Sequence, residues 1–306
     1  MKTGIHDGIP FADYLAVPAC SNSRLSHIHE RSAAYCKYRL DGGGSQTDAM
    51  VLGVAAHAAV LEPGALERRC VVAGQCEAVA KSSGERCKAQ GSLFRDGGWY
   101  CRVRGHAPPP PPDEPAETRA VLTREQFDSV LAIRESVWSH PRAAVLLDSC
   151  LRFEASAFWT DTLTGLPCKA RPDALGPAGL CIDLKVSAGA RPSKFPRYCL
   201  DYGMHRQAAF YMDGLRELGK PVEEYRIVAV ESTPPYEVVV YRLHPDALEI
   251  GRNEIAVLKA TYAECARTGI WPGFSATDED LMLPAWAMSE GLPELKLTVK
   301  GEGIEF

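Results

Sequence analysis

Hydrophobic residues recur along the chain with two different spacings, and these spacings separate the expected helices from the expected strands. Helical intervals, or nearly continuous small apolar residues, predict helices at 49–63, 123–148, 202–218 and 246–269. Alternation of apolar and polar residues, or short apolar runs bounded by Gly and Pro, predicts strands at 151–161, 168–175, 179–187, 224–233 and 236–243.

The order of these segments predicts a mixed α/β fold. Helices come first, with Ser21 or Ser23 as the expected cap of the first one. Three strands, a helix, two strands and a long helix follow. Such an order is typical of a central mixed sheet flanked by helices. We therefore expect an N-terminal helical part at 1–69, a core at 116–275 and a C-terminal tail at 276–306.

Residues 70–115 lack apolar periodicity, and this predicts an insertion into the core. The segment is rich in Gly, Ser, Cys and basic residues, and the proline run "APPPPPDEPAE" follows. Consecutive prolines favour an extended polyproline conformation, so we expect a stiff linker at the exit of the insertion.

Cys76, Cys87, Cys101 and His106 give the insertion the spacing C-x10-C-x13-C-x4-H. Four such ligands suit a tetrahedral structural Zn²⁺, whose binding would supply folding energy that so small a segment cannot obtain from a core. The pattern resembles short zinc-binding modules of phage and bacterial proteins. Two alternatives stay open: the cysteines are scattered thiols, or Cys70 replaces one ligand. The insertion, with six Lys or Arg and three acids over 76–106, is either an added DNA contact or a structural spacer.

Bulk composition limits the classes of function. The chain has 306 residues, 46% of them hydrophobic, and a net charge of −5, which excludes a globally basic nucleic-acid binder but not a local basic patch. The start shows no secretory signal, and no apolar run approaches the length of a membrane span. Eleven cysteines in such a chain favour a reducing compartment, so a cytoplasmic location is expected.

The stretch "ARPDALGPAGLCIDLK" contains the strongest candidate chemistry. Side chains alternate along a strand, so Asp183 and Lys185 are expected on one face, and a reversal at "GPAG" returns Asp173 to the same end of the sheet. Converging carboxylates repel unless a cation neutralises them, and Mg²⁺ prefers such hard oxygen ligands. Spacing alone also fits a surface hairpin with a salt bridge.

Further motifs surround this hairpin. "FEASAFW" precedes it, "MHRQAAFY" follows it, and "MVLGVAAHAAVLEP" lies upstream. Together they resemble the PD-(D/E)XK nuclease superfamily, and more narrowly its RecE (exonuclease VIII) branch with a RecB-like nuclease domain. The resemblance covers roughly 1–65 and 120–275, while the insertion is not part of it. It implies a restriction-endonuclease-like core.

The resemblance assigns roles by motif position. Asp173, Asp183 and Lys185 match the catalytic motif, and His57 and Glu154 are implied as further Mg²⁺ or Mn²⁺ ligands. Gln207 and Tyr211 match the Q-x-x-x-Y motif and are implied in DNA contact. Arg171, next to the catalytic motif, is a further candidate for DNA contact or simply flanks the site. Each has a simpler alternative, namely a core histidine, a solvated strand residue, or helix packing. The stretch 185–206, with five Lys or Arg and one acid, is a plausible track for a DNA backbone.

The implied activity is metal-assisted phosphodiester hydrolysis. RecE-type relatives resect the 5′ strand of linear duplex DNA in phage-type recombination, alongside a single-strand annealing protein, and they form rings, so a homo-oligomer is open here. The alternatives are an endonuclease, a single-strand nuclease of DNA repair, a DNA-binding member that no longer cuts, and an α/β domain without any nucleic-acid role. No membrane partner is expected.

Overall fold

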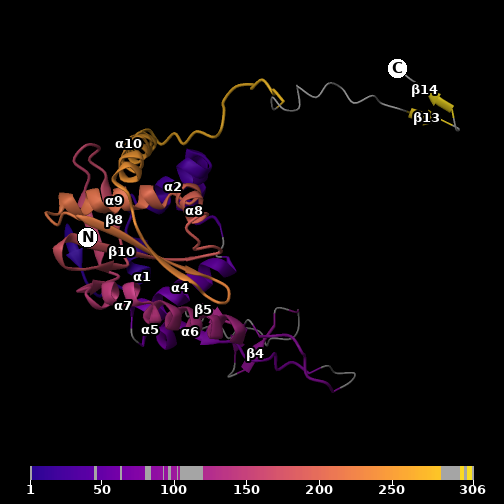
Figure 1. The fold of residues 1–306 in the computed structure, drawn as a ribbon. Helices are drawn as coiled ribbons and strands as arrows, with labels where there is room; N and C mark the ends of the chain where they lie inside the picture. The colour runs from indigo at the N-terminus through magenta and orange to yellow at the C-terminus, as the bar shows by residue number, and fades with distance from the viewer. Residues whose placement is uncertain are drawn as a thin grey trace. The chain divides into compact units, whose positions relative to one another are not determined.

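The computed structural model of the protein divides into two units, Met1–Trp271 and Pro272–Phe306, which are described separately (Figure 1). In the second unit, β13 (Leu297–Val299) pairs antiparallel with β14 (Glu302–Ile304). The structure describes residues 2–44, 47–62, 64–79, 84–91, 93–95, 98–101, 103, 120–283, 297–299 and 302–304.

A five-stranded mixed sheet occupies the centre of the first unit, in the order β12-β11-β10-β9-β6. β10 and β11 run parallel, and the other neighbours run antiparallel. Its strands are β6 (Arg152–Phe153), β9 (Ala174–Leu175), β10 (Leu180–Ser187), β11 (Glu224–Glu231) and β12 (Val238–Arg242). A 3-10 turn at Pro177–Gly179 reverses the chain between β9 and β10, as "GPAG" predicts.

A second, antiparallel sheet continues two of the predicted strands. It consists of β1 (Gly4–His6), β7 (Ser156–Thr160) and β8 (Pro167–Ala170), in the order β1-β7-β8. The expectation of one unbroken strand at 151–161 is therefore wrong, because the segment is divided between β6 and β7. The expected strand at 168–175 is divided in the same way between β8 and β9. Both interruptions lie where the two sheets meet.

Helices cover both faces of the central sheet. The α-helices among the described residues are α1 (Phe11–Ala16), α2 (Asn22–Glu30), α3 (Ala33–Leu40), α4 (Asp48–Leu61), α5 (Ala65–Arg69), α6 (Arg124–Ser139), α7 (Pro141–Asp148), α8 (Phe195–Asp201), α9 (Met204–Glu217) and α10 (Pro245–Thr268). The helix expected at 123–148 is two helices, because Pro141 has no N–H to continue α6 and instead begins α7. α8 was not expected.

Alternation along β10 assigns its side chains to two cores. Ile182 and Leu184 pack in a buried cluster with residues of α4, α6 and α7. Cys181 packs in another cluster with residues of α9 and α10, on the opposite side of the sheet (Figure 1). Asp183, an odd-numbered residue like Cys181, therefore faces α9. The mixed α/β architecture predicted from the sequence is confirmed.

The insertion leaves and re-enters the core on neighbouring strands. β2 (Cys70–Val72) pairs parallel with β5 (Ala120–Leu122), with Cys70 opposite Ala120. Within the insertion, β3 (Leu93–Arg95) pairs antiparallel with β4 (Gly98–Tyr100). Across the described part of the whole chain, no helix combines the length and the apolar character needed to span a bilayer.

Candidate metal centre

Three acidic residues form a row across neighbouring strands of the central sheet. The antiparallel register of β9 and β10 pairs Ala174 with Ile182, so one step further it brings Asp173 opposite Asp183. The register of β6 and β9 pairs Phe153 with Ala174, which brings Glu154 opposite Asp173 in the same way. The row lies just after β6 ends and just before β9 begins, at the middle of β10.

Local backbone geometry fixes this row. The Glu154 amide donates to the Asp173 carbonyl at 2.9 Å, and the Leu184 amide donates to Asp173 Oδ2 at 2.6 Å. Glu154 has a φ of 52°, a left-handed conformation that is uncommon for a residue other than Gly. This conformation ends β6 and separates it from β7, so the side chain of Glu154 does not follow the alternation of an unbroken strand.

His57 approaches the acids from α4. Its Nδ1 lies 3.6 Å from Asp173 Oδ1 and 3.8 Å from Glu154 Oε1. One ligand atom from each of His57, Glu154 and Asp173 lies within 4.8 Å of the other two. In an octahedral site with ligands at 2.0–2.1 Å, donor atoms lie about 3 Å apart when adjacent and about 4 Å apart when opposite. The three donors therefore fit a small divalent cation, and the imidazole suits Mn²⁺ as well as Mg²⁺.

Asp183 lies beside these three residues in a network of its own. Its Oδ2 is 2.6 Å from Lys185 Nζ, and its Oδ1 accepts a hydrogen bond from Gln207 Nε2 at 2.8 Å. Lys185 Nζ donates in turn to Gln207 Oε1 at 3.1 Å. Gln207 on α9 therefore bridges the aspartate and the lysine, and its amide orientation follows from those two partners. The shared face that alternation predicts for Asp183 and Lys185 agrees with this ion pair.

The electrostatics of His57 and Asp173 reflect their proximity. Burial disfavours the imidazolium, but the negative charges of Asp173 and Glu154 outweigh it and raise the pKa of His57 to about 10. Burial also opposes ionisation of Asp173, but His57 and Lys185 outweigh this effect and lower the pKa of that carboxyl. Without a cation, a proton on His57 therefore neutralises part of the carboxylate charge.

Burial acts in opposite directions on Asp183 and Lys185. It raises the pKa of Asp183 to about 6, because the attraction of Lys185 offsets only part of the cost of removing the carboxylate from water. It disfavours the charged form of Lys185, yet Asp183 and Asp173 outweigh this effect and raise the pKa of the lysine. Lys185 is thus a cation at neutral pH, 22% exposed at its side chain.

Arg171 is engaged by the protein on several sides. Its Nε donates to Glu154 Oε2 at 2.8 Å, and its guanidinium also donates to the Ser156 hydroxyl at 3.1 Å and the Ile9 carbonyl at 2.9 Å. The residue is 9% exposed. Sequence reasoning implied a DNA contact for Arg171, whereas this environment favours a role in holding Glu154.

Lys169 is a residue that sequence reasoning missed. Its buried ammonium donates to the carbonyls of Tyr14, Leu15 and Val17 at 2.8, 3.0 and 2.8 Å, at the end of α1. It lies two positions before Arg171, which binds the Ile9 carbonyl just before the same helix. The two side chains therefore secure α1 beside the acidic row. The paired spacing of these two cations, separated by one residue on a predicted strand, was the available signal.

Tyr211 follows Gln207 by one helical turn on α9. It is half-buried and packs against the core cluster between the sheet and α10. Burial raises the pKa of the Tyr211 phenol well above its usual range. The ring therefore contacts the protein over much of its surface, and its implied contact with DNA stays a prediction.

The insertion brings Cys76, Cys87 and Cys101 together. Their sulfur atoms all lie within 4.8 Å of one another, and the Cys87 and Cys101 sulfurs are 4.0 Å apart. Tetrahedral Zn–S bonds of about 2.3 Å separate two sulfurs by about 3.8 Å, so the cluster fits zinc. Cys70 is not a member, because it lies in β2 and packs with Leu66 and Leu122. His106, the fourth predicted ligand, lies outside the described residues.

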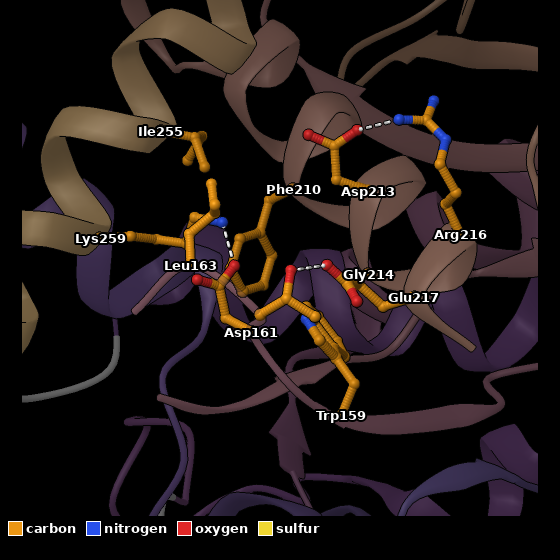
Figure 2. A pocket seen from close by; sticks show the side chains of 11 residues that line it. Trp159, Asp161, Leu163, Phe210, Asp213, Gly214, Arg216, Glu217, Ile255 and Lys259 are labelled. Carbon is orange, nitrogen blue, oxygen red and sulfur yellow. Dashed lines mark hydrogen bonds and ion pairs between the residues drawn. The ribbon is translucent and has the colours of Figure 1, made fainter. Parts of the chain in front are cut away.

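A cavity of about 350 Å³ lies between β7, α9 and α10, apart from the acidic row (Figure 2). Its charged groups have protein partners: Asp161 pairs with Lys259, Asp213 pairs with Arg216, and Glu217 accepts a hydrogen bond from the Thr162 hydroxyl. Trp159 covers Gly214 so closely that a Cβ there would lie 2.4 Å from the indole. None of the predicted site residues lines this cavity.

Residues 21–279 match a family described as a PDDEXK-like domain of unknown function (DUF3799). The chain belongs to this family. No curated protein matches the sequence. Among solved structures, a protein from Eubacterium rectale described as "Putative exonuclease" is 13% identical, with a TM-score of 0.58 over 93% of this chain and 99% of that chain. This likeness shows a shared fold. Membership of the PDDEXK-like family, together with that fold, confirms the PD-(D/E)XK-like core predicted from the sequence.

Proposed function

We propose that the protein is a divalent-metal-dependent deoxyribonuclease that hydrolyses phosphodiester bonds at the acidic row. The observation that carries the proposal is the meeting of His57, Glu154 and Asp173 within 4.8 Å, beside the Asp183–Lys185 pair. A basic residue next to a group of carboxylates suits a phosphate substrate that is bound through a cation. Membership of a PDDEXK-like family supports the same chemistry.

His57, Glu154 and Asp173 would hold Mg²⁺ or Mn²⁺, and Asp183 would join them from the neighbouring strand. The cation would supply Lewis-acid stabilisation of phosphate charge and a water of lowered pKa. Arg171 keeps Glu154 in position, and the Leu184 amide keeps one oxygen of Asp173 occupied, which leaves Oδ1 toward His57.

Lys185 would act on the phosphate itself. Asp183 and Gln207 hold its ammonium from two sides, so the cation reaches the site already oriented. An oriented positive charge stabilises the negative charge that develops on the phosphate oxygens, and it loses little reorganisation energy in the reaction. Gln207 would hold Lys185 and Asp183 in fixed positions relative to each other through its hydrogen bond to each.

For the mode of cutting, we propose a 5′–3′ exonuclease that acts on linear duplex DNA in phage-type homologous recombination, with a single-strand annealing protein as partner. The resemblance to the RecE branch and the likeness to a protein described as "Putative exonuclease" support this mode. An endonuclease with the same site, or a single-strand nuclease of DNA repair, is the competing proposal. For the insertion, we propose a structural Zn²⁺ on Cys76, Cys87, Cys101 and His106.

Cleavage assays on end-labelled linear duplex and on covalently closed circles test the activity and its mode. We expect Mg²⁺-dependent release of nucleotides from the labelled 5′ strand of linear DNA and no cutting of circles. Lys185→Ala should lower the rate by about 10²–10³-fold, the range for loss of a positioned charge. Lys259→Ala is a matched control, because it removes a similarly buried ion pair remote from the acidic row.

Cutting of closed circles would contradict the exonuclease mode and favour the endonuclease. Activity that persists both in EDTA and in Lys185→Ala would contradict the assignment of the site.

A further inference from the structure

Two stacked tyrosines and three basic residues lie together on and around α8. The rings of Tyr198 and Tyr202 are 5.7 Å apart at an interplanar angle of 8°. Tyr202 is 65% exposed, and Tyr198 is half-buried beneath it. Arg191, Lys194 and Arg197 are all exposed. We call these five residues the α8 surface.

Buried contacts hold this surface on the core. Phe195, 2% exposed, stacks on the Tyr241 ring of β12 at 4.5 Å and 7°. The Ala190 amide donates to the Glu231 carboxylate at 3.2 Å, and the Ala190 carbonyl accepts from the Tyr241 hydroxyl at 2.5 Å. The exposed residues between these two anchors therefore project from a fixed backbone.

The charge of the α8 surface is not neutralised by its surroundings. Arg191 and Lys194 form no ion pair with any residue that the structure describes. Arg197 binds Asp201 at 2.8 Å, but this is an exposed pair, and such pairs are weak in water. A polyanion that approaches α8 would meet two unpaired cations and one weakly held cation.

The α8 surface lies next to the proposed catalytic lysine. Gly189 is four residues beyond Lys185, and a Cβ on it would lie 3.7 Å from the Tyr198 ring. Cys199 adjoins Tyr198, and its carbonyl lies 3.4 Å from His205 Nδ1, two residues before Gln207. A strand that leaves the acidic row past Lys185 would therefore reach the two tyrosines.

We propose that the α8 surface binds a single-stranded segment of the DNA substrate, with bases stacked on Tyr202 and Tyr198 and phosphates on Arg191 and Lys194. The inference rests on the proposed nuclease function and adds to it the state of the strand beside the site. Bases in the interior of a duplex are already stacked on both faces, so successive bases of a strand can stack on protein aromatic rings only where the strand is unpaired. Aromatic rings that accept successive bases, within a basic track, are how proteins hold single strands.

Fluorescence anisotropy in EDTA separates this binding from cleavage. The probes are a fluorescein-labelled single-stranded oligonucleotide of mixed sequence and a blunt hairpin duplex, each titrated with the full chain. Tyr202→Ala should weaken single-strand binding about tenfold, the loss typical of one stacking ring, and change duplex binding less than twofold. Tyr202→Phe keeps the ring and should bind like the wild type. Leu163→Ala, which removes an exposed apolar residue elsewhere, is the control.

Equal weakening on both probes, or no weakening of single-strand binding by Tyr202→Ala, would overturn the proposal. Arg191→Gln together with Lys194→Gln should weaken single-strand binding and reduce its salt dependence. If these two substitutions weaken single-strand binding while Tyr202→Ala does not, the surface contacts phosphates only and the stacking proposal fails. Binding in EDTA does not depend on hydrolysis. If the variants change binding as expected but the wild-type protein cuts no DNA, the proposed nuclease function is refuted and the binding role of the α8 surface still holds.

Discussion

Arg171 and Glu154 form a nearly buried ion pair at the point where the two sheets meet. Nε of the arginine donates to Oε2 of the carboxylate at 2.8 Å, and the side chains are 8% and 13% exposed. The other oxygen of Glu154 is left for His57, at 3.8 Å. The arginine therefore decides which carboxylate oxygen faces the proposed cation.

We expect Arg171→Met to destabilise the fold by about 3–5 kcal/mol, because it leaves a buried carboxylate without its partner. Urea unfolding in EDTA measures this loss, and calorimetric titration with Mn²⁺ should show weaker binding as Glu154 loses its orientation. Arg197→Ala breaks an exposed pair and should change stability by less than about 0.5 kcal/mol. A wild-type stability for Arg171→Met would contradict the positioning role.

His57 predicts how stability depends on pH in the absence of metal. Its folded pKa of about 10 lies above the ordinary value of 6.5, so the folded state binds the proton more tightly than the unfolded chain. The stabilisation is therefore complete below pH 6.5 and is lost as the pH rises toward 10.

Urea unfolding in EDTA between pH 6.5 and 8.5 should show the free energy of unfolding falling with pH. His57→Gln should flatten this slope. When EDTA is replaced by saturating Mn²⁺, the free energy of unfolding should fall less with pH, because the cation competes with the proton on His57. A slope in His57→Gln equal to that of the wild type would show that other groups cause the dependence.

The hydrogen bond from Gln207 to Asp183 predicts how the cleavage rate falls at acidic pH, which is the acid limb of its pH profile. The Gln207 amide donates to Asp183, and a hydrogen bond to the ionised form stabilises a carboxylate. Gln207→Leu should therefore raise the pKa of Asp183 further above its value of about 6 and move the acid limb of the cleavage rate to higher pH. Arg216→Ala, on the cavity side of α9, should leave the limb in place. A uniform fall in rate with no movement of the limb would contradict this account.

The cysteine cluster predicts a bound metal in the insertion. Zinc analysis of the full chain should find about one equivalent, and Cys87→Ser should remove it, because a three-sulfur site depends on each thiolate. Cys150→Ser is a matched control outside the cluster and should retain zinc. His106→Ala should weaken retention if the predicted fourth ligand is correct. Protein with reduced thiols and no zinc would contradict the site.

Much of the site follows from local rules that a sequence carries. Period-two alternation predicts that Asp183 and Lys185 share a face, and the Gly- and Pro-rich turn predicts the return of Asp173. The spacing of Thr123 and Gln126 is another local rule, since the Thr123 hydroxyl accepts from the Gln126 amide at 3.0 Å and the Thr123 amide donates to the Gln126 side chain at 2.9 Å, which forms a capping box at the start of α6.

Other features depend on contacts between distant segments. Glu154 interrupts a strand because its backbone is left-handed, a conformation that a glutamate does not predict. The alternating pattern continues on both sides of it, so the sequence gives no sign of the interruption. In the sequence, Arg171 is one of several basic residues on predicted strands. Its role depends on contacts with Ile9 and Ser156, which only the folded chain brings to it. α8 is hard to predict because its seven residues make only about two turns, which is too short for the spacing of apolar residues to separate a helix from a loop.

The parallel pairing of β2 with β5 sets a lower limit on the length of the segment between them. Cys70 lies opposite Ala120 and Val72 opposite Leu122, so the chain leaves at one end of the pair and returns at the other. Such a crossover requires about a dozen residues or more, and a tight turn cannot replace it. A shortened protein without the cysteine cluster would therefore need a spacer of that length between Val72 and Ala120 for the two strands to pair.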